Sequence, residues 1–358
     1  MSHRDHNLMQ RAFAEASKGN WLFTAPNPLV GALALQGGHV VAYGHHAIFG
    51  GLHAEAGALQ HAPNADELIV TLEPCSSTSG GKKQPPCTSV IIESGVERVV
   101  IGALDPDPRH AGAGVKILEA AGIEVSVLSF DDQFAKQNSA FLNHLSADVP
   151  FVIAKWAASA DGFVAATGGK SKWISNASSR QEVHRLRGSS QAVLSASGTV
   201  VADNPRLNAR DVEHNIMQAK VLVGCASKVD ESSAVLSDSL QRIWFDNHQD
   251  EFDWATDQDH FFNMSTGNEV DLLQMCQVLK KQFNINRMLI EAGPKILNSF
   301  FEARLVHSVV KYQAPIILGG GVSACLGEGV TEPAAAIRLK DELRAEFGTD
   351  LRQAWLVE

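Results

Sequence analysis

One histidine, one glutamate and two cysteines near the beginning of the chain have the types and order of a hydrolytic metal site. His53 and Glu55 lie in the segment GGLHAEAGALQ (50–60), and Cys75 and Cys87 each directly follow a proline. An imidazole and two thiolates bind Zn²⁺ strongly and leave the fourth tetrahedral position for a water molecule, whose pKa zinc lowers to about 7. Glu55 can then take the proton of this water and deliver it to a ring nitrogen and a departing amine, without binding the metal.

This order is the signature of zinc-dependent nucleobase deaminases, in which a His-x-Glu segment precedes a Pro-Cys pair and a second cysteine. A structural zinc site would usually have four protein ligands, and no fourth cysteine or histidine is evident nearby. His53 alone would more simply be a loop or core histidine, but the combined pattern favours a catalytic site. We also expect Cys75 and Cys87 to lie at helix N-termini, where the helix dipole favours a thiolate.

The scaffold of this site is predicted by alternating apolar runs and helical patterns in the first part of the chain. The predicted strands cover residues 29–35, 39–43, 67–72, 98–104 and 123–128. The predicted helices cover residues 52–61, 88–94 and 112–121, with Gly95 and Gly122 at helix ends, and a further helix covers 131–146. This alternation predicts a three-layer α/β domain over residues 1–147, followed by a short linker near 147–150.

A second set of strands and helices begins at Phe151 and predicts a second α/β domain over residues 148–358. Its predicted strands cover residues 151–158, 191–195, 219–224, 242–246, 287–293 and 307–318. Its predicted helices cover residues 177–187, 271–282 and 295–305. Residues 226–270 are polar and are interpreted as largely irregular. Two domains also agree with the length of 358 residues, given roughly 150 residues per domain.

Composition and charge argue against several classes of binding partner and cellular location. The formal net charge is −10 and no run is dense in lysine and arginine, which argues against nucleic-acid binding. No apolar run is long enough for a transmembrane helix, and the polar N-terminal segment does not have the pattern of a signal peptide. The 5 cysteines are odd in number and scattered, so no disulfide framework is expected. We therefore expect a cytoplasmic enzyme with a small-molecule substrate.

Together these segments resemble one family, the bifunctional deaminase and reductase of riboflavin biosynthesis. In the first domain the resemblance is carried by PNPLVGA, LHAE, TLEPC, QPPC and DPDPRHAGAGVKILEAAGIEV. In the second it is carried by PFVIAKWAASADG, SKWIS, HRLRGSSQAVL, GTVVADNPRLNAR, LIEAGPKIL and APIILGG. It extends from about residue 5 to 320, with a poorly matched stretch near 211–285.

For the first domain, the resemblance implies a cytidine-deaminase-like fold of three α/β/α layers. It implies hydrolytic removal of the exocyclic amine of a phosphoribosylaminopyrimidine, 2,5-diamino-6-(5-phosphoribosylamino)pyrimidin-4(3H)-one. By the same resemblance His53, Cys75 and Cys87 are the zinc ligands, and Glu55 moves the proton. Asn27 is implied as a substrate contact, since its side-chain amide can pair with a pyrimidine edge.

For the second domain, the resemblance implies a dihydrofolate-reductase-like α/β fold that uses NADPH to reduce the ribosyl group to ribityl. The sequence has no strand–GxGxxG–helix unit, so a Rossmann site is not supported. The implied cofactor contacts are Ala158, Trp173, Thr199, Asp203 and Gly293. The implied substrate contacts are Lys155, Ser171, Arg187, Leu207, Arg210 and Glu291. Lys155 would be costly to bury unpaired in its apolar strand, so we expect it to face the site.

The sequence departs from the family pattern at several positions. The segment between the two cysteines is longer than usual, and we hypothesise that Lys82 or Lys83 within it contacts the substrate phosphate. In the second domain Gln191 replaces the usual Asp before AVL, Ala196 replaces the usual Gly before the GT segment, and Ala292 replaces a Gly of the usual EGG. His307 and Ser308 replace a usual acidic pair.

Two alternatives therefore stay open beside the bifunctional enzyme. One is a deaminase with a weak or inactive reductase domain. The other is a deaminase of nucleic acids, which the net charge disfavours. The family also implies a homodimer formed through the second domain, and the sequence does not distinguish NADPH from NADH.

Overall fold

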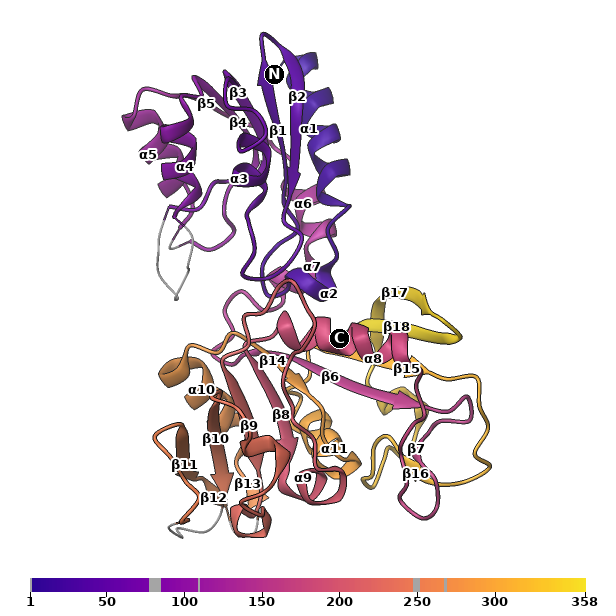
Figure 1. Cartoon of the computed structure of the whole chain (residues 1–358). Coiled ribbons are helices and arrows are strands. Elements are labelled where there is room, and N and C mark those ends of the chain that lie inside the picture. The colour runs from indigo at the N-terminus through magenta and orange to yellow at the C-terminus, as the bar shows by residue number, and fades with distance from the viewer. Residues whose placement is uncertain (1, 77–84, 109, 247–251, 267–268) are drawn as a thin grey trace. The chain divides into compact units, whose positions relative to one another are not determined.

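The computed structural model describes residues 2–76, 85–108, 110–246, 252–266 and 269–358. Lys82 and Lys83 lie outside the described residues. The chain divides into two compact units, Met1–Ser146 and Ala147–Glu358. Each unit has its own mixed sheet and its own helices (Figure 1).

The first unit is a five-stranded sheet between two layers of helices. The strand order is β2-β1-β3-β4-β5, in which β2, β1 and β3 are antiparallel neighbours and β3, β4 and β5 are parallel. The strands are β1 (Gly31–Gln36), β2 (His39–His45), β3 (Glu67–Leu72), β4 (Arg98–Ala103) and β5 (Glu124–Val127). The helices are α1 (His3–Ala16), α2 (Trp21–Thr24), α3 (Ala54–Leu59), α4 (Cys87–Ser94), α5 (Ala113–Ala120), α6 (Asp131–Gln137) and α7 (Ser139–Leu142).

Helices α1 and α6 cover one face of this sheet, and α3, α4 and α5 cover the other, which confirms the predicted three layers (Figure 1). β3 is buried along its whole length, as expected for a strand with helices on both faces. Gly44 lets α3 approach β2 closely, because a Cβ at this position would lie 2.2 Å from the carbonyl oxygen of Ala54. This close approach places the beginning of α3, which carries Glu55, against the sheet.

The single helix predicted over residues 131–146 is wrong, since the segment forms α6 and α7 with a break at Asn138. The Asn138 backbone has φ −119° and ψ 34°, outside the helical region. Its side chain accepts a hydrogen bond from the Leu29 N–H (2.6 Å) and donates one to the Leu29 carbonyl (3.2 Å). The break therefore lets the Asn138 amide satisfy a buried backbone segment that precedes β1.

The second unit is built on a nine-stranded sheet with the order β11-β10-β9-β8-β14-β6-β15-β18-β17. The seven strands from β11 to β15 in this order are parallel, and β18 and β17 are antiparallel additions at one edge. These strands are β6 (Phe151–Ala158), β8 (Ala192–Ala196), β9 (Ala219–Val223), β10 (Gln241–Asp246), β11 (Asp259–Asn263), β14 (Arg287–Ile290), β15 (Ser308–Gln313), β17 (Leu339–Phe347) and β18 (Asp350–Val357).

Helices and short elements complete this unit. The longer helices are α8 (Ala177–Gly188), α9 (Ser197–Asp203), α10 (Leu272–Phe283) and α11 (Pro294–Glu302). The short strand pairs are β7 (Phe163–Ala165) with β16 (Val322–Ser323), and β12 (Ser265–Thr266) with β13 (Glu269–Val270). The 3-10 turns are η1 (Ala226–Lys228), η2 (Ala234–Leu236) and η3 (Pro333–Ala335).

The interpretation of residues 226–270 as largely irregular is wrong for 259–263, which form the strand β11. Asp259 in this strand is buried, and its carboxylate accepts hydrogen bonds from Arg242 (Nε and Nη2, both 2.7 Å) and from Trp244 Nε1 (2.9 Å). β11 is a five-residue strand at the sheet edge, DHFFN, whose two adjacent phenylalanines are too short an apolar run for periodicity to detect. The predicted strand over 307–318 is also too long, since β15 ends at Gln313.

His307, one of the departures from the family pattern, packs against β6 and gives a first testable prediction. The Val152 N–H donates to its Nδ1 (3.1 Å), and the ring stacks on Phe151 with centroids 5.3 Å apart. Burial, with a smaller effect of Lys280, lowers the pKa of His307 to about 4. The unfolded chain, with a histidine pKa of about 6.5, therefore takes up the proton first as the pH falls.

We expect His307 to cost the second unit up to about 3 kcal/mol of unfolding free energy as the pH falls from about 6.5 to about 4. Denaturant unfolding at pH 7.5 and 4.5 measures this loss. His307→Asn keeps an acceptor for the Val152 N–H but does not titrate, so its stability should fall less over the same interval. An equal loss in the variant would contradict the prediction.

Candidate active sites

Three side chains from separate elements form a metal-binding cluster in the first unit. His53 is the N-cap residue of α3, Cys87 is the first residue of α4, and Cys75 follows β3. One ligand atom from each lies within 4.8 Å of the others. His53 Nδ1 is 3.1 Å from Cys87 Sγ and 3.7 Å from Cys75 Sγ. One imidazole nitrogen and two sulfurs at these spacings fit a tetrahedral Zn²⁺ site that keeps one position open.

The expectation that both thiolates lie at the start of a helix holds for Cys87 and is wrong for Cys75, which lies in an irregular segment. The N-terminus of α4 nevertheless lies close to both sulfurs, because Cys87 is its first residue and the Cys87 N–H donates to Cys75 Sγ (3.4 Å). The positive end of a single helix dipole therefore faces the pair of thiolates.

Glu55 lies in the first turn of α3 and is only 4% exposed. Burial raises the pKa of Glu55, and the neighbouring Cys75 raises it further, while His53 opposes the shift. A carboxyl group whose pKa moves toward neutral can both take and give a proton at the working pH. The position and burial of Glu55 therefore suit a proton-transfer group beside the metal cluster.

A cavity of about 160 Å³ opens next to this cluster and is lined by His53, Glu55, Cys75 and Asn27, among others. His46, which sequence reasoning missed, also lines it. The His46 Nδ1–H donates to the Leu52 carbonyl (2.9 Å), so its Nε2 can accept from the Asn27 Nδ2–H (3.2 Å). This arrangement directs the Asn27 amide nitrogen to His46 and leaves the amide oxygen as the acceptor for a ligand.

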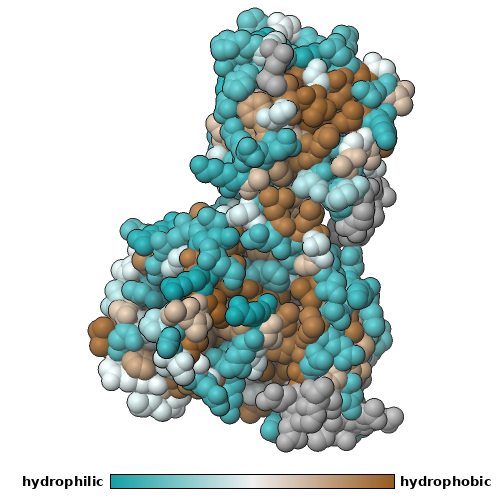
Figure 2. Space-filling view, turned by 180° about the vertical axis from the view of Figure 1, so that it is seen from behind, coloured by the Kyte–Doolittle hydropathy of each residue, from teal (hydrophilic) through white to brown (hydrophobic). Residues whose placement is uncertain are grey.

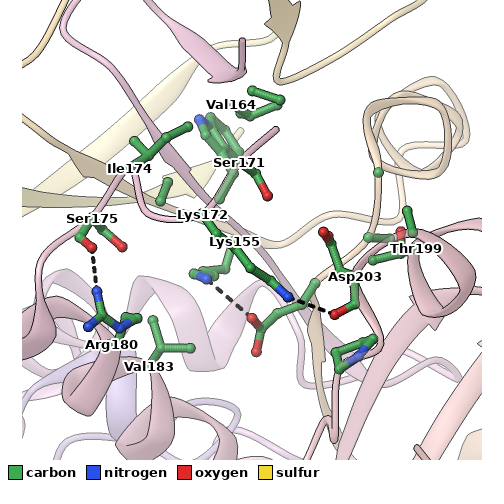
Figure 3. A pocket seen from close by; sticks show the side chains of 18 of the residues that line it. Lys155, Val164, Ser171, Lys172, Ile174, Ser175, Arg180, Val183, Thr199 and Asp203 are labelled. Carbon is green, nitrogen blue, oxygen red and sulfur yellow. Dashed lines mark hydrogen bonds and ion pairs between the residues drawn. The ribbon is translucent and has the colours of Figure 1, made fainter. Parts of the chain in front are cut away.

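A larger cavity of about 690 Å³ lies in the second unit (Figure 3). Nearly all of the residues implied in the reductase site line it. They are Lys155, Ser171, Trp173, Arg187, Thr199, Asp203, Leu207, Arg210, Glu291 and Gly293. Ala158 is the exception, since it is 1% exposed and does not line the cavity.

A part-buried ion network lies at the wall of this cavity. The Glu291 carboxylate accepts from Arg187 Nε (2.5 Å) and Nη2 (3.0 Å), and from Lys155 Nζ (3.2 Å). Burial alone would keep this carboxyl neutral, but Arg187 and Lys155 outweigh burial and hold the pKa of Glu291 well below its usual range. Lys155 is thus not buried unpaired: its ammonium group meets Glu291 beside the cavity (Figure 3).

Positive charge gathers at one end of the cavity. Arg187 Nη1 donates to the Asn208 carbonyl (3.1 Å), and Arg210 Nη1 donates to the Asn208 side-chain oxygen (2.5 Å). Burial lowers the pKa of Arg210, and the nearby Arg187 and Arg206 lower it further. Cations that crowd one another in this way are suited to an anionic ligand group such as a phosphate.

Two further cationic residues of this cavity were not predicted from the sequence. Lys172 Nζ donates to the Asp203 carbonyl (2.9 Å; Figure 3). The Arg180 guanidinium lies 4.5 Å from the centre of the Trp173 ring, while its Nη1 donates to the Ser175 carbonyl (2.6 Å). Trp173 is 68% exposed, so this stacking holds the indole at the cavity surface.

The departures from the family pattern have different surroundings. Gln191 fastens the start of β8 to the segment before β14, by donating to the Asn284 carbonyl (3.0 Å) and accepting from the Asn286 N–H (2.7 Å). Ala196 is the N-cap residue of α9. Of these replacements Ala292 alone, among the described residues, lines the large cavity.

In comparisons with known proteins, each of the two units matches a protein family. Residues 2–103 match the family described as the cytidine and deoxycytidylate deaminase zinc-binding region, and residues 150–352 match the RibD C-terminal domain. The riboflavin biosynthesis protein RibD of Escherichia coli is 31% identical over 364 residues, which covers 97% of this chain and 98% of the relative. RibD of Buchnera aphidicola is 33% identical over 88% of each chain.

Solved structures agree as well. RibD of Acinetobacter baumannii is 30% identical with a TM-score of 0.76, covering 99% of each chain. A deaminase and reductase from Thermotoga maritima is 29% identical with a TM-score of 0.72, again covering 99% of each chain.

The fold and the two cavities thus define a zinc-dependent deaminase joined in one chain to an NADPH-dependent reductase. The chain belongs to the RibD family of bifunctional enzymes in riboflavin biosynthesis. No helix in the described part of the chain is both long enough and apolar enough to span a membrane.

Proposed function

We propose that residues 1–147 deaminate 2,5-diamino-6-(5-phosphoribosylamino)pyrimidin-4(3H)-one, and that residues 148–358 then reduce the ribosyl side chain of the product to ribityl with NADPH. The observation that carries the first half is the cluster of His53, Cys75 and Cys87 with the buried carboxyl of Glu55 beside it. The second half is carried by the large cavity, where the part-buried Glu291 carboxylate and its ion partners lie near a concentration of positive charge.

In the deaminase site, His53, Cys75 and Cys87 would hold zinc through one nitrogen and two sulfurs. When bound, zinc supplies an activated water as the nucleophile. The Glu55 carboxylate would take one proton from the water and give it to the ring nitrogen, and would then carry a second proton from the added hydroxyl to the exocyclic amine, which leaves as ammonia. The Asn27 side-chain oxygen, oriented by His46, accepts from an N–H on the pyrimidine edge and so fixes the ring in the cavity.

In the reductase site, NADPH supplies the hydride when it is bound. Gly293 precedes α11, whose first backbone N–H groups can hold a cofactor phosphate, and Thr199 lies close to Gly293. Trp173 and Asp203 supply further walls of the cofactor site, whereas Ala158 is buried and is not assigned a contact with the cofactor. Arg187 and Arg210, assisted by the Ser171 hydroxyl, bind the substrate phosphate, Leu207 packs against the substrate, and Lys155 and Glu291 orient the ribosyl group.

Two assays with the purified protein test this function separately. Ammonia release is measured with the diaminopyrimidine substrate, and NADPH oxidation is measured with the deaminated product. Ammonia release together with NADPH oxidation supports the bifunctional enzyme, whereas ammonia release alone selects a deaminase with an inactive reductase domain. Ala292 in the cavity wall favours this second candidate, because a backbone that must approach a cofactor tolerates a larger residue poorly. Running the second assay with NADH identifies the preferred cofactor.

We also propose a cytoplasmic homodimer formed through the second unit. The described cysteines are all free, as suits a reducing compartment. The strand β17 lies at the sheet edge, and edge strands readily pair with another chain. The second unit also exposes apolar side chains such as Ile317 and Val330, and the space-filling view shows hydrophobic surface on this unit (Figure 2). Light scattering, measured on the protein as it elutes from a size-exclusion column, should give the mass of two chains.

A further inference from the structure

Glu73, which directly precedes the Pro-Cys pair, has an unusual set of hydrogen bonds. Its side chain is 5% exposed, and its carboxylate accepts from four backbone N–H groups. Oε2 accepts from Asp105 (3.1 Å) and Gly112 (2.9 Å), and Oε1 accepts from Gly114 (2.8 Å) and Val115 (3.3 Å). A carboxylate that satisfies four buried donors is costly to alter, because each donor would lose its partner.

Three of these donors lie at the beginning of α5. The residue before this helix is Gly112, which has no side chain to cap it, and no side-chain cap bond is made from that position. Glu73, the residue that follows β3, therefore supplies the cap from another part of the chain, and its negative charge complements the positive end of the helix dipole. The fourth donor, Asp105, lies on the wall of the small cavity.

The backbone next to Glu73 is held just as closely. A Cβ on Gly114 would lie 2.3 Å from the Pro74 carbonyl oxygen, so the first turn of α5 packs directly on the backbone before Cys75. The Glu73 N–H donates to the Ala103 carbonyl (2.9 Å). On the other side, the Cys75 carbonyl accepts from the Thr88 N–H (3.2 Å) in α4. The segment that carries the metal ligand is thus fixed between two helices.

We propose that Glu73 is a positioning residue of the deaminase centre: by capping α5 it fixes Cys75 in the metal-binding cluster and Asp105 on the cavity wall. Glu73 also lines the small cavity, but both of its carboxylate oxygens accept from backbone N–H groups, so its role is to act through these two residues. This inference rests on the proposed function, because it presupposes that Cys75 is a zinc ligand.

Glu73→Gln tests the proposal. Glutamine keeps the size of the side chain, but its amide nitrogen would face two N–H groups that have lost their acceptor. We expect zinc affinity, measured by competition with a chromogenic chelator, to fall by about 10- to 100-fold, as is typical when a group supporting a metal ligand is removed. In the Co²⁺-substituted protein the thiolate charge-transfer bands should shift. KM for the diaminopyrimidine should rise because the Asp105 segment moves.

The matched control is Asp271→Asn in the second unit. Asp271 caps α10 by accepting from the Gln274 N–H (2.9 Å), so this variant also replaces a capping carboxylate with an amide. Zinc affinity and the Co²⁺ spectrum should be those of the unaltered protein. Should Glu73→Gln fail to fold, Glu73→Asp is used instead. Aspartate is shorter by one methylene but keeps the carboxylate, so its loss of zinc affinity should be smaller than the loss expected for glutamine.

The outcomes separate this inference from the proposed function. If the unaltered protein binds one zinc and the folded Glu73 variant shows the same affinity and the same Co²⁺ spectrum, the positioning role is wrong while the zinc centre stands. If the unaltered protein binds no zinc, the proposed deaminase centre itself is wrong.

Discussion

Replacing Glu55 with glutamine should reduce ammonia release about a thousandfold or more, while the protein keeps its zinc. A positioned proton-transfer group contributes about 10²- to 10⁴-fold to catalysis, and the buried carboxyl of Glu55 is the candidate group beside the metal cluster. Glutamine has nearly the same shape, so His53, Cys75 and Cys87 should stay in place. Ammonia release measures the loss, and metal analysis measures the retained zinc.

Glu15→Gln is the matched control for this variant. Glu15 is a buried carboxylate on α1 in the same unit, where it pairs with Lys18 (2.6 Å) and His45 (2.9 Å) away from the cavity residues. This control should keep most of its ammonia release. NADPH oxidation with the deaminated product should be unchanged in both variants, because the second unit has a separate core. Turnover by Glu55→Gln within tenfold of the unaltered enzyme would refute the assigned role.

The metal cluster could be predicted from the sequence because the types and the order of its residues indicate its chemistry. A histidine, a carboxylate two residues later and two cysteines after prolines are an uncommon combination, and few other arrangements would use it. His46 and Glu73 carry no such signal. Their importance comes from contacts with Asn27 and with the start of α5, across elements that only the folded chain brings together.

The helices and strands, too, could be predicted where local sequence determines them, but not where contacts between distant residues determine them. Strands such as 67–72 and 151–158 were predicted with the bounds that the structure has, because buried strands are continuous apolar runs. β11 was missed because it is a short edge strand with only two adjacent apolar residues, and the Arg242–Asp259 pair that fixes it is a contact between strands. The helix predicted over 131–146 is interrupted because Asn138 bonds to the distant Leu29.

The second unit offers the other large expected effect: Glu291→Gln should reduce the kcat/KM of NADPH oxidation at least about 100-fold and destabilise this unit by about 3 kcal/mol. Arg187 and Lys155 both pair with this part-buried carboxylate. Removing one partner of a fully buried ion pair typically costs about 3–5 kcal/mol, so we expect the lower end of that range. The two cations would then repel each other where they meet the substrate. A 100-fold loss of rate corresponds to about 2.7 kcal/mol of transition-state stabilisation.

The pH dependence of stability should change in the same variant. The pKa of Glu291 is held well below its usual range, so its contribution is present above the unfolded-state pKa of about 4.5 and is lost as the pH falls through the folded-state pKa. Glu291→Gln lacks this contribution, so denaturant unfolding should show a smaller loss of stability on acidification. Ammonia release should be unaffected, because the deaminase cavity belongs to the other unit.

Glu182→Gln separates loss of stability from loss of function. Glu182 is 2% exposed and pairs with Arg352 (2.7 Å) and Arg185 (3.1 Å) in the same unit, but it does not line the large cavity. Both variants should lower the unfolding free energy by a similar amount, whereas Glu291→Gln alone should lower kcat/KM strongly. If the two variants lose the same fraction of reductase activity, Glu291 acts only by holding the fold together and its role at the substrate is wrong.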